Sequence, residues 1–181
     1  MSILKKIISR IRGEQNINKL IKRGLVIGRN CHLGNCTIDP SHCFHISIGD
    51  DVTFGPQVLI LAHDASTKMF LGYTRVANVS IGNNVFIGAH SIVLPGVTIG
   101  DNVVVGAGSV VCHDIPDNSV AVGNPARVIK SLPDFLERRK KEMSPDNTLE
   151  DEFSLRNPDF SASHREKLIS LCHDFGQAYI K

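Results

Sequence analysis

The chain has 181 residues and a formal net charge of +2, so it lacks the strongly basic character that marks nucleic-acid-binding proteins. Aromatic residues make up 6 %, Trp is absent, and no apolar run approaches the length of a membrane span. Five Cys residues without paired spacing predict reduced thiols and a cytoplasmic protein.

Residues 1–24 are predicted to form a short N-terminal helix followed by a polar lead-in. One face of the helix, over residues 1–12, is apolar, with basic residues opposite; the apolar face consists of Ile3, Leu4, Ile7, Ile8 and Ile11. Because Lys and Arg interrupt the apolar stretches, no signal peptide is expected. Two interpretations are open: a peripheral membrane contact suited to a lipid-linked substrate, and a helix packed on the domain that follows, which the shortness of the segment favours.

A six-residue repeat dominates residues 25–132. Apolar residues recur at one position, and Gly or a small residue follows most of them; the apolar positions are Ile48, Phe54, Ile60, Ile81, Ile87, Val93, Ile99, Val105 and Val111. This period is neither the 3.6 residues of a helix nor the alternation of a half-buried strand. It predicts a parallel β-helix, in which three repeats make one turn of a triangular prism. The Gly123–Ala126 segment contains Pro125 and is predicted to end the repeat.

The repeat is interrupted between Ile60 and Ile81, and residues 62–79 are predicted to leave the prism as an extruded loop. Loops on rigid scaffolds often carry functional sites. Beyond the repeat, residues 133–181 are predicted to form a helical C-terminal extension. Its last helix is expected over residues 162–178, with Ser163 and Glu166 as a capping box. The extension is expected to pack on the prism or on a neighbouring subunit.

Four segments resemble a known family: residues 81–90 (IGNNVFIGAH), 94–100 (LPGVTIG), 105–111 (VGAGSVV) and 123–129 (GNPARVI). They are similar to the left-handed β-helix acyltransferases, and most of all to the maltose, galactoside and streptogramin O-acetyltransferase branch with its polysaccharide-biosynthesis relatives. The resemblance covers residues 25–132 well and both ends poorly. It implies an all-β fold, a left-handed parallel β-helix. It also implies a homotrimer with active sites between subunits, and acetyl-CoA as the acyl donor.

The resemblance implies a catalytic role for His63, which stands just before the extruded loop, where the family has its general base. A hydroxyl acceptor needs a base that titrates near neutral pH, and imidazole is the side chain that does so. A surface loop histidine is the alternative. Asp64 is a weaker candidate to orient the imidazole or to contact the substrate.

Further residues are expected to bind the two substrates. The arm of acetyl-CoA needs close approach to the backbone, and its phosphates need cations. The candidate donor-binding residues are Gly88, Ala89, Gly106, Ala107, Cys112, His113, Arg127 and Lys130. Cys112 and His113 stand where the family commonly has Thr and Lys, and a solvated basic edge is the alternative for Arg127 and Lys130. The candidate substrate-binding residues are Asp64, Asn84, Phe86 and His90.

The expected function is therefore acetyl-CoA-dependent O-acetyl transfer to a hydroxyl of a sugar or polysaccharide precursor. Two alternatives are an N-acyltransferase that uses the same His63 on an amino sugar, and a non-catalytic β-helix scaffold. No metal is expected. The cluster of Cys31, His32, Cys36, His42, Cys43 and His45 fits no common zinc spacing, and no His lies between His63 and His90 to complete the metal site of carbonic anhydrases with this fold.

Overall fold

The computed structural model describes residues 15–181, so the predicted helix over residues 1–12 and its membrane contact lie outside the described residues. The chain divides into two compact units, one ending at Pro133 and the other comprising Asp134–Lys181. Within the described residues, no helix has the length and apolar character needed to cross a membrane.

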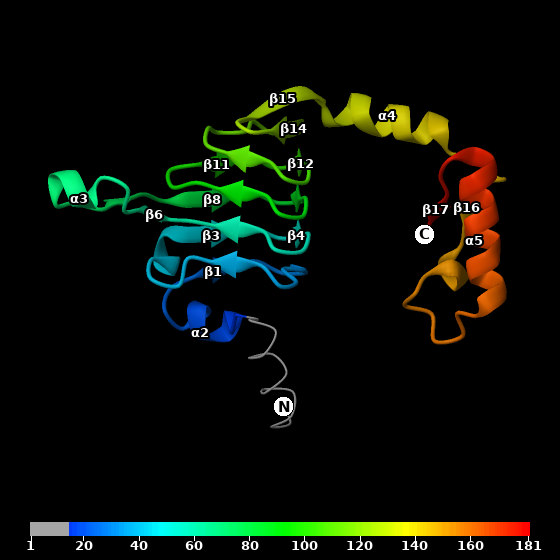
Figure 1. Cartoon of the computed structure of the whole chain (residues 1–181), viewed down its shortest axis with the longest axis horizontal. Helices are drawn as coiled ribbons and strands as arrows, with labels where there is room; N and C mark the ends of the chain where they lie inside the picture. The colour runs from blue at the N-terminus through cyan, green and yellow to red at the C-terminus, as the bar shows by residue number, and fades with distance from the viewer. Residues whose placement is uncertain (1–14) are drawn as a thin grey trace. The chain divides into compact units, whose positions relative to one another are not determined.

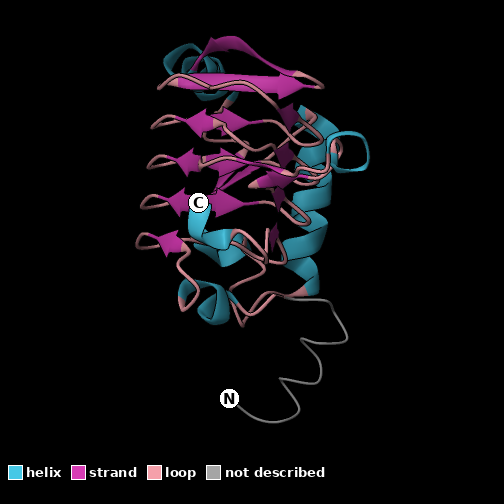
Figure 2. Cartoon of the chain, turned by 90° about the vertical axis from the view of Figure 1, so that its left-hand side faces the viewer, coloured by secondary structure: helices cyan, strands magenta, loops and turns pink. Residues whose placement is uncertain are grey.

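The first unit is a β-helix of three sheets whose strands are parallel except for the last, β15 (Figures 1 and 2). Sheet A contains β1 (Val26–Ile27), β3 (Ile46–Ile48), β8 (Val79–Ile81) and β11 (Thr98–Ile99). Sheet B contains β4 (Thr53–Phe54), β9 (Phe86–Ile87), β12 (Val104–Val105), β14 (Ser119–Gly123) and β15 (Ala126–Ser131). Sheet C contains β2 (Thr37–Ile38), β5 (Leu59–Ile60), β10 (Ile92–Val93) and β13 (Val110–Val111). A short helix, α2 (Ile17–Ile21), precedes β1 and is capped by the Asn16 side chain.

The predicted repeat builds the core of this unit. The nine apolar repeat positions from Ile48 to Val111 point inward, and each is at most 4 % exposed. Equivalent positions stack in register, so that Ile81 lies opposite both Ile48 and Ile99 in neighbouring coils. The parallel β-helix predicted from the six-residue period is confirmed, with the stacked sheets typical of the left-handed form.

Three kinds of corner join the sheets, and we name each by the sheets it connects. Regular turns of the AB corner include residues 49–52 and 82–85, and those of the BC corner include residues 55–58 and 88–91. The CA corner is formed by residues 39–45, 61–78, 94–97 and 112–114, which follow β2, β5, β10 and β13. Because these strands are neighbours in sheet C, the four CA turns stack in that order along the prism.

Both long insertions lie at the CA corner. The step from Ile38 to Ile48 is four residues longer than the regular six and contains the 3-10 helix η1 (Cys43–His45). The step from Ile60 to Ile81 is fifteen residues longer and contains the hairpin of β6 (His63–Asp64) and β7 (Arg75–Val76), with α3 (Lys68–Leu71) at its tip. Figure 1 shows this hairpin projecting from the stacked strands. The two irregularities of the repeat therefore gather at one corner.

The β-helix ends where β14 and β15 pair antiparallel, with Gly123 opposite Ala126 at the turn. α4 (Leu132–Glu142) leads into the second unit. The second unit also contains β16 (Thr148–Leu149), η2 (Asp151–Phe153), α5 (Ala162–Phe175) and β17 (Tyr179–Ile180). The predicted cap of α5 is wrong: Ser161 is the N-cap and forms the capping box with His164. The helix stops at Phe175, before Gly176 in the left-handed conformation.

Candidate active site

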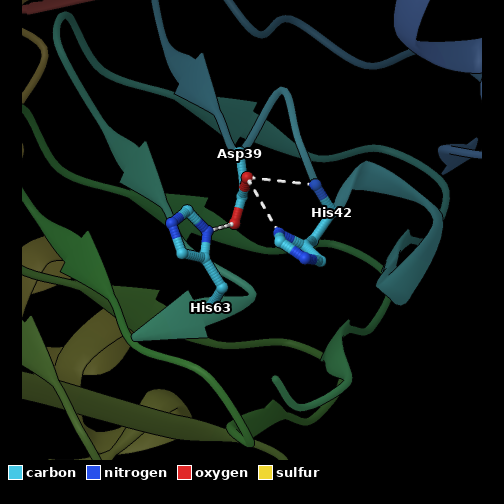
Figure 3. Close-up of side chains that lie close together, drawn as sticks. All are labelled: Asp39, His42 and His63. Carbon is cyan, nitrogen blue, oxygen red and sulfur yellow. Dashed lines mark hydrogen bonds and ion pairs between the residues drawn. The ribbon is translucent and has the colours of Figure 1, made fainter. Parts of the chain in front are cut away.

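His63 is the first residue of the hairpin at the CA corner, and its side chain is 33 % exposed. Its Nδ1 faces the carboxylate of Asp39, which comes from the CA turn of the preceding coil (Figure 3). Because the pKa of that carboxyl is lowered, the carboxylate accepts and Nδ1–H donates. In a neutral imidazole that carries its proton on Nδ1, Nε2 is the ring nitrogen with the free lone pair.

Asp39 is fully buried and follows Ile38, the last residue of β2. Its Oδ1 accepts from the backbone N–H groups of Ser41 (3.0 Å) and His42 (3.1 Å), and its Oδ2 accepts from Ala62 N–H (3.1 Å). Burial raises the pKa of Asp39, but the hydrogen bonds from His63 and these backbone groups outweigh it and hold the pKa below its ordinary value. Hydrogen bonds thus compensate for the burial of the Asp39 charge.

Sequence reasoning missed Asp39. It lies in the stretch where the repeat first loses its period, and that irregularity was the available signal. In its place Asp64 was considered as a residue to orient His63. The structure instead directs the Asp64 carboxylate to the Ser66 N–H (2.8 Å), which lowers the pKa of Asp64. Asp64 and His63 do line one cavity of about 330 Å³, together with Leu61, Ala65, Arg75, Leu94 and Pro95.

His42 completes the cluster in Figure 3. Its ring centroid lies 4.8 Å from that of His63, and its Nδ1 is 3.9 Å from Asp39 Oδ1, too far for a hydrogen bond. The three side chains are of metal-ligating types. However, four hydrogen bonds already occupy the lone pairs of Asp39, so a metal ion would have to displace one of them. The arrangement suits an oriented base better than a metal centre.

His113 lies at the same corner, two coils beyond His63, and the Arg127 side chain reaches it from β15. His113 Nδ1 is 3.1 Å from Cys112 Sγ and 3.4 Å from Arg127 Nη1. His113, Arg127, Asp114, Ile115, Ala126 and Val128 line a cavity of about 340 Å³. Lys130, on β15, does not line this cavity. The structure therefore brings His113 and Arg127 together, with the guanidinium as donor and the imidazole Nδ1 as acceptor.

Comparison with known proteins places this chain in a family. A family model described as a bacterial transferase hexapeptide with six repeats matches residues 78–113. Protein CapG of Staphylococcus aureus is 44 % identical over 135 residues, which cover 70 % of this chain and 76 % of that protein. The chain belongs to the hexapeptide-repeat acetyltransferase family.

Other members of the family are covered less completely. Galactoside O-acetyltransferase of Escherichia coli (strain K12) is 41 % identical over 115 residues, which cover 59 % of this chain and 57 % of that protein. The solved structure of a galactoside acetyltransferase in complex with coenzyme A matches with a TM-score of 0.55 and 42 % identity, over 61 % of this chain and 56 % of the other. The chain thus spans little more than half the length of these two relatives.

Several residues predicted from the hexapeptide family lie away from His63 within one chain. The residues Gly88, Ala89, His90, Gly106 and Ala107 lie at or beside the BC corner. A Cβ on Gly88 would sit 2.7 Å from the Ala107 Cα, so the stacking of coils alone requires this glycine.

The remaining two predicted residues belong to other parts of the prism. Asn84 lies at the AB corner, where its amide donates to Asn102 Oδ1 (3.2 Å), and Phe86 lies on sheet B opposite Thr53 and Val104. The structure does not bring Asn84 or Phe86 to His63 within one chain.

Proposed function

We propose that this chain is an acetyl-CoA-dependent O-acetyltransferase that acts on a hydroxyl group of a sugar or polysaccharide precursor. The observation that carries the proposal is His63, held through Nδ1 by the buried carboxylate of Asp39 at the edge of a cavity of about 330 Å³. The names of the galactoside O-acetyltransferase and of the coenzyme A complex support the transferred group, the sugar acceptor and the donor.

His63 supplies the chemistry as a general base. Its Nε2 removes the proton of the acceptor hydroxyl while that oxygen attacks the thioester carbonyl carbon, so that a C–O bond forms. The C–S bond then breaks, and the imidazolium returns its proton to the departing sulfur, which leaves an acetyl ester and free coenzyme A. Asp39 keeps Nδ1 protonated throughout and stabilises the imidazolium. A base placed in this way contributes about 10²–10⁴-fold to the rate.

Residues beyond His63 at the CA corner fit the donor. Arg127 and His113 offer a guanidinium and an imidazole to the phosphates, and their cavity opens at the same corner as the base. Cys112 contacts His113 and takes part only through it. Lys130 would add charge from β15.

The remaining donor residues argue for more than one copy of the chain. Ala89 and Ala107 lie at the BC corner, one prism side from the CA corner, and the six residue-to-residue steps from Gly88 to Leu94 span at most about 20 Å. A site that uses both corners therefore forms most simply between two copies. We extend the proposal to a homotrimer with its active sites between subunits, closed by cyclic symmetry. His90, Asn84 and Phe86 would contact the acceptor only in that assembly.

The test is thiol release from acetyl-CoA with a panel of hexoses, disaccharides and amino sugars. We expect release that depends on a sugar and a product that mild alkali deacetylates, because esters are alkali-labile and amides are not. An alkali-stable product formed only from amino sugars would instead establish the N-acyltransferase alternative. No sugar-dependent release would leave the non-catalytic scaffold as the better account.

A further inference from the structure

The two ends of the CA corner differ in the residues they carry along the prism axis. The turns that follow β2, β5, β10 and β13 stack in that order, so His63 has one CA turn on one side and two on the other. His113, with the Arg127 guanidinium beside it, lies on the side of β13. Residues 39–45 lie on the side of β2. If the donor phosphates bind Arg127 on the side of β13, the turn after β2 is left for the acceptor.

That turn presents three aromatic rings in contact, which we call the aromatic platform: His42, Phe44 and His45. The ring centroids of Phe44 and His45 are 4.7 Å apart, and those of His42 and Phe44 are 6.1 Å apart. The platform adjoins the His63 ring through His42, whose ring centroid lies 4.8 Å away, while the cavity beside His63 is lined by Leu94 and Pro95 of the next coil. Phe44 is 55 % exposed, so a ligand can reach its face.

Hydrogen bonds and packing contacts with the rest of the unit hold the platform in place. His42 N–H donates to Asp39 Oδ1, and His45 Nδ1 lies 2.7 Å from Asn78 Oδ1 at the far end of the hairpin insertion. Cys43, which lies between His42 and Phe44 in the sequence, is fully buried. Gly24 lies so close beneath Phe44 that a Cβ on Gly24 would sit 2.8 Å from the Phe44 Cβ. The backbone of the platform and the His45 ring are therefore held before any ligand arrives, which lowers the entropy cost of binding.

We infer that His42, Phe44 and His45 form the acceptor subsite, on which the apolar C–H face of a pyranose ring stacks and directs a hydroxyl to His63. The inference rests on the proposed function and names the surface that selects a sugar. Aromatic rings attract C–H groups at their electron-rich faces. Nε2 of His42 or His45 can hydrogen-bond to a hydroxyl group, because Nδ1 of His42 is buried and Nδ1 of His45 is held by Asn78. Phe44 is then a residue that determines acceptor affinity, while His63 performs the chemistry.

The experiment measures KM for the acceptor and for acetyl-CoA separately, with the most active sugar of the panel. Phe44→Ala is expected to raise the acceptor KM about ten-fold and leave the KM for acetyl-CoA unchanged, as loss of one aromatic stacking contact predicts. Phe44→Tyr is expected to keep the wild-type acceptor KM. Phe44→Leu, which restores apolar bulk without a ring, is expected to behave like the Ala variant.

Phe175→Ala is the matched control, since Phe175 is 47 % exposed and belongs to the second unit. An unchanged acceptor KM in Phe44→Ala would overturn the inference. So would a rise in the KM for acetyl-CoA, because the platform would then bind the adenine of the donor. If wild-type protein releases no thiol with any sugar, the proposed function fails first and the acceptor subsite fails with it.

Discussion

His63 and Asp39 are coupled because the hydrogen bond between them stabilises the buried carboxylate and orients the imidazole. A buried carboxylate is costly unless hydrogen bonds replace its water, and Asp39 receives three from the backbone and one from His63. In return, Asp39 accepts a hydrogen bond from Nδ1 of His63, which in the proposed mechanism leaves Nε2 for the acceptor hydroxyl. His42 packs beside the pair and supplies one of the backbone donors.

Asp39→Asn is expected to lower kcat about 10²–10⁴-fold, because the amide no longer fixes the productive tautomer of His63. Asp64→Asn is the matched control, since its carboxylate bonds to Ser66 instead, and it should change kcat by less than about ten-fold. Steady-state kinetics with both substrates saturating make the comparison. If Asp64→Asn were the more damaging change, the assignment of the orienting carboxylate would be reversed.

The lowered pKa of Asp39 also predicts how stability depends on pH. A carboxyl whose pKa is lower in the folded than in the unfolded state stabilises the fold above the unfolded pKa of about 3.9, and this contribution disappears as pH falls through the folded pKa. Asp39→Asn should therefore lower Tm at pH 7 more than at pH 3. Thermal unfolding at the two pH values measures this, and an equal Tm difference at both would contradict it.

The position of His63 could be predicted from sequence because it opens a visible break in the repeat. The position of its partner, Asp39, could not be predicted from sequence. Asp39 precedes His63 by 24 residues and reaches it only because the coil stacks β2 beside β5. Asp64, the nearer carboxylate in sequence, turns to its own loop because a short Asp side chain readily bonds to a backbone N–H two residues ahead.

At the scale of elements, the six-residue period predicted the strands and the core of the β-helix. The interior of the 62–79 insertion was beyond that pattern, because β6 and β7 pair antiparallel without contributing to the repeat. The capping box of α5 was misplaced by two residues: Ser161 and Ser163 are both reasonable caps, and the choice depends on whether His164 or Glu166 lies close enough to the cap.

Stacked corners predict unequal effects of glycine substitution. A Cβ on Gly55 would lie 2.5 Å from Ala89 N and 2.9 Å from Ala89 Cα, so Gly55→Ala must push neighbouring coils apart. We expect a cost of about 1–3 kcal/mol, or roughly 2–12 °C in Tm. Gly72→Ala, at a positive φ of 78° but with nothing within 4 Å, should cost about 1 kcal/mol through backbone strain alone. Thermal unfolding that ranks Gly72→Ala as the costlier change would contradict this account of the corners.

For the whole molecule, the separation of the CA and BC corners predicts that two inactive variants can restore each other. His63→Ala lacks the base, and Ala107→Trp blocks the BC corner, where Ala107 is exposed. If sites form between copies, random co-assembly in equal amounts gives intact pairs of corners at about a quarter of sites. Co-expressed and co-purified chains should show that fraction of wild-type activity. Mixed assemblies as inactive as the separate variants would place each site within one chain.

The central claim is that His63, held by Asp39, removes the proton of a sugar hydroxyl during acetyl transfer. The most direct measurement is kcat for sugar-dependent thiol release by His63→Ala, together with the Kd for acetyl-CoA from calorimetry. We predict a fall in kcat of about 10²–10⁴-fold with the Kd unchanged, because the imidazole acts on the acceptor and the donor phosphates bind elsewhere. A His63→Ala protein with near wild-type kcat would contradict the claim.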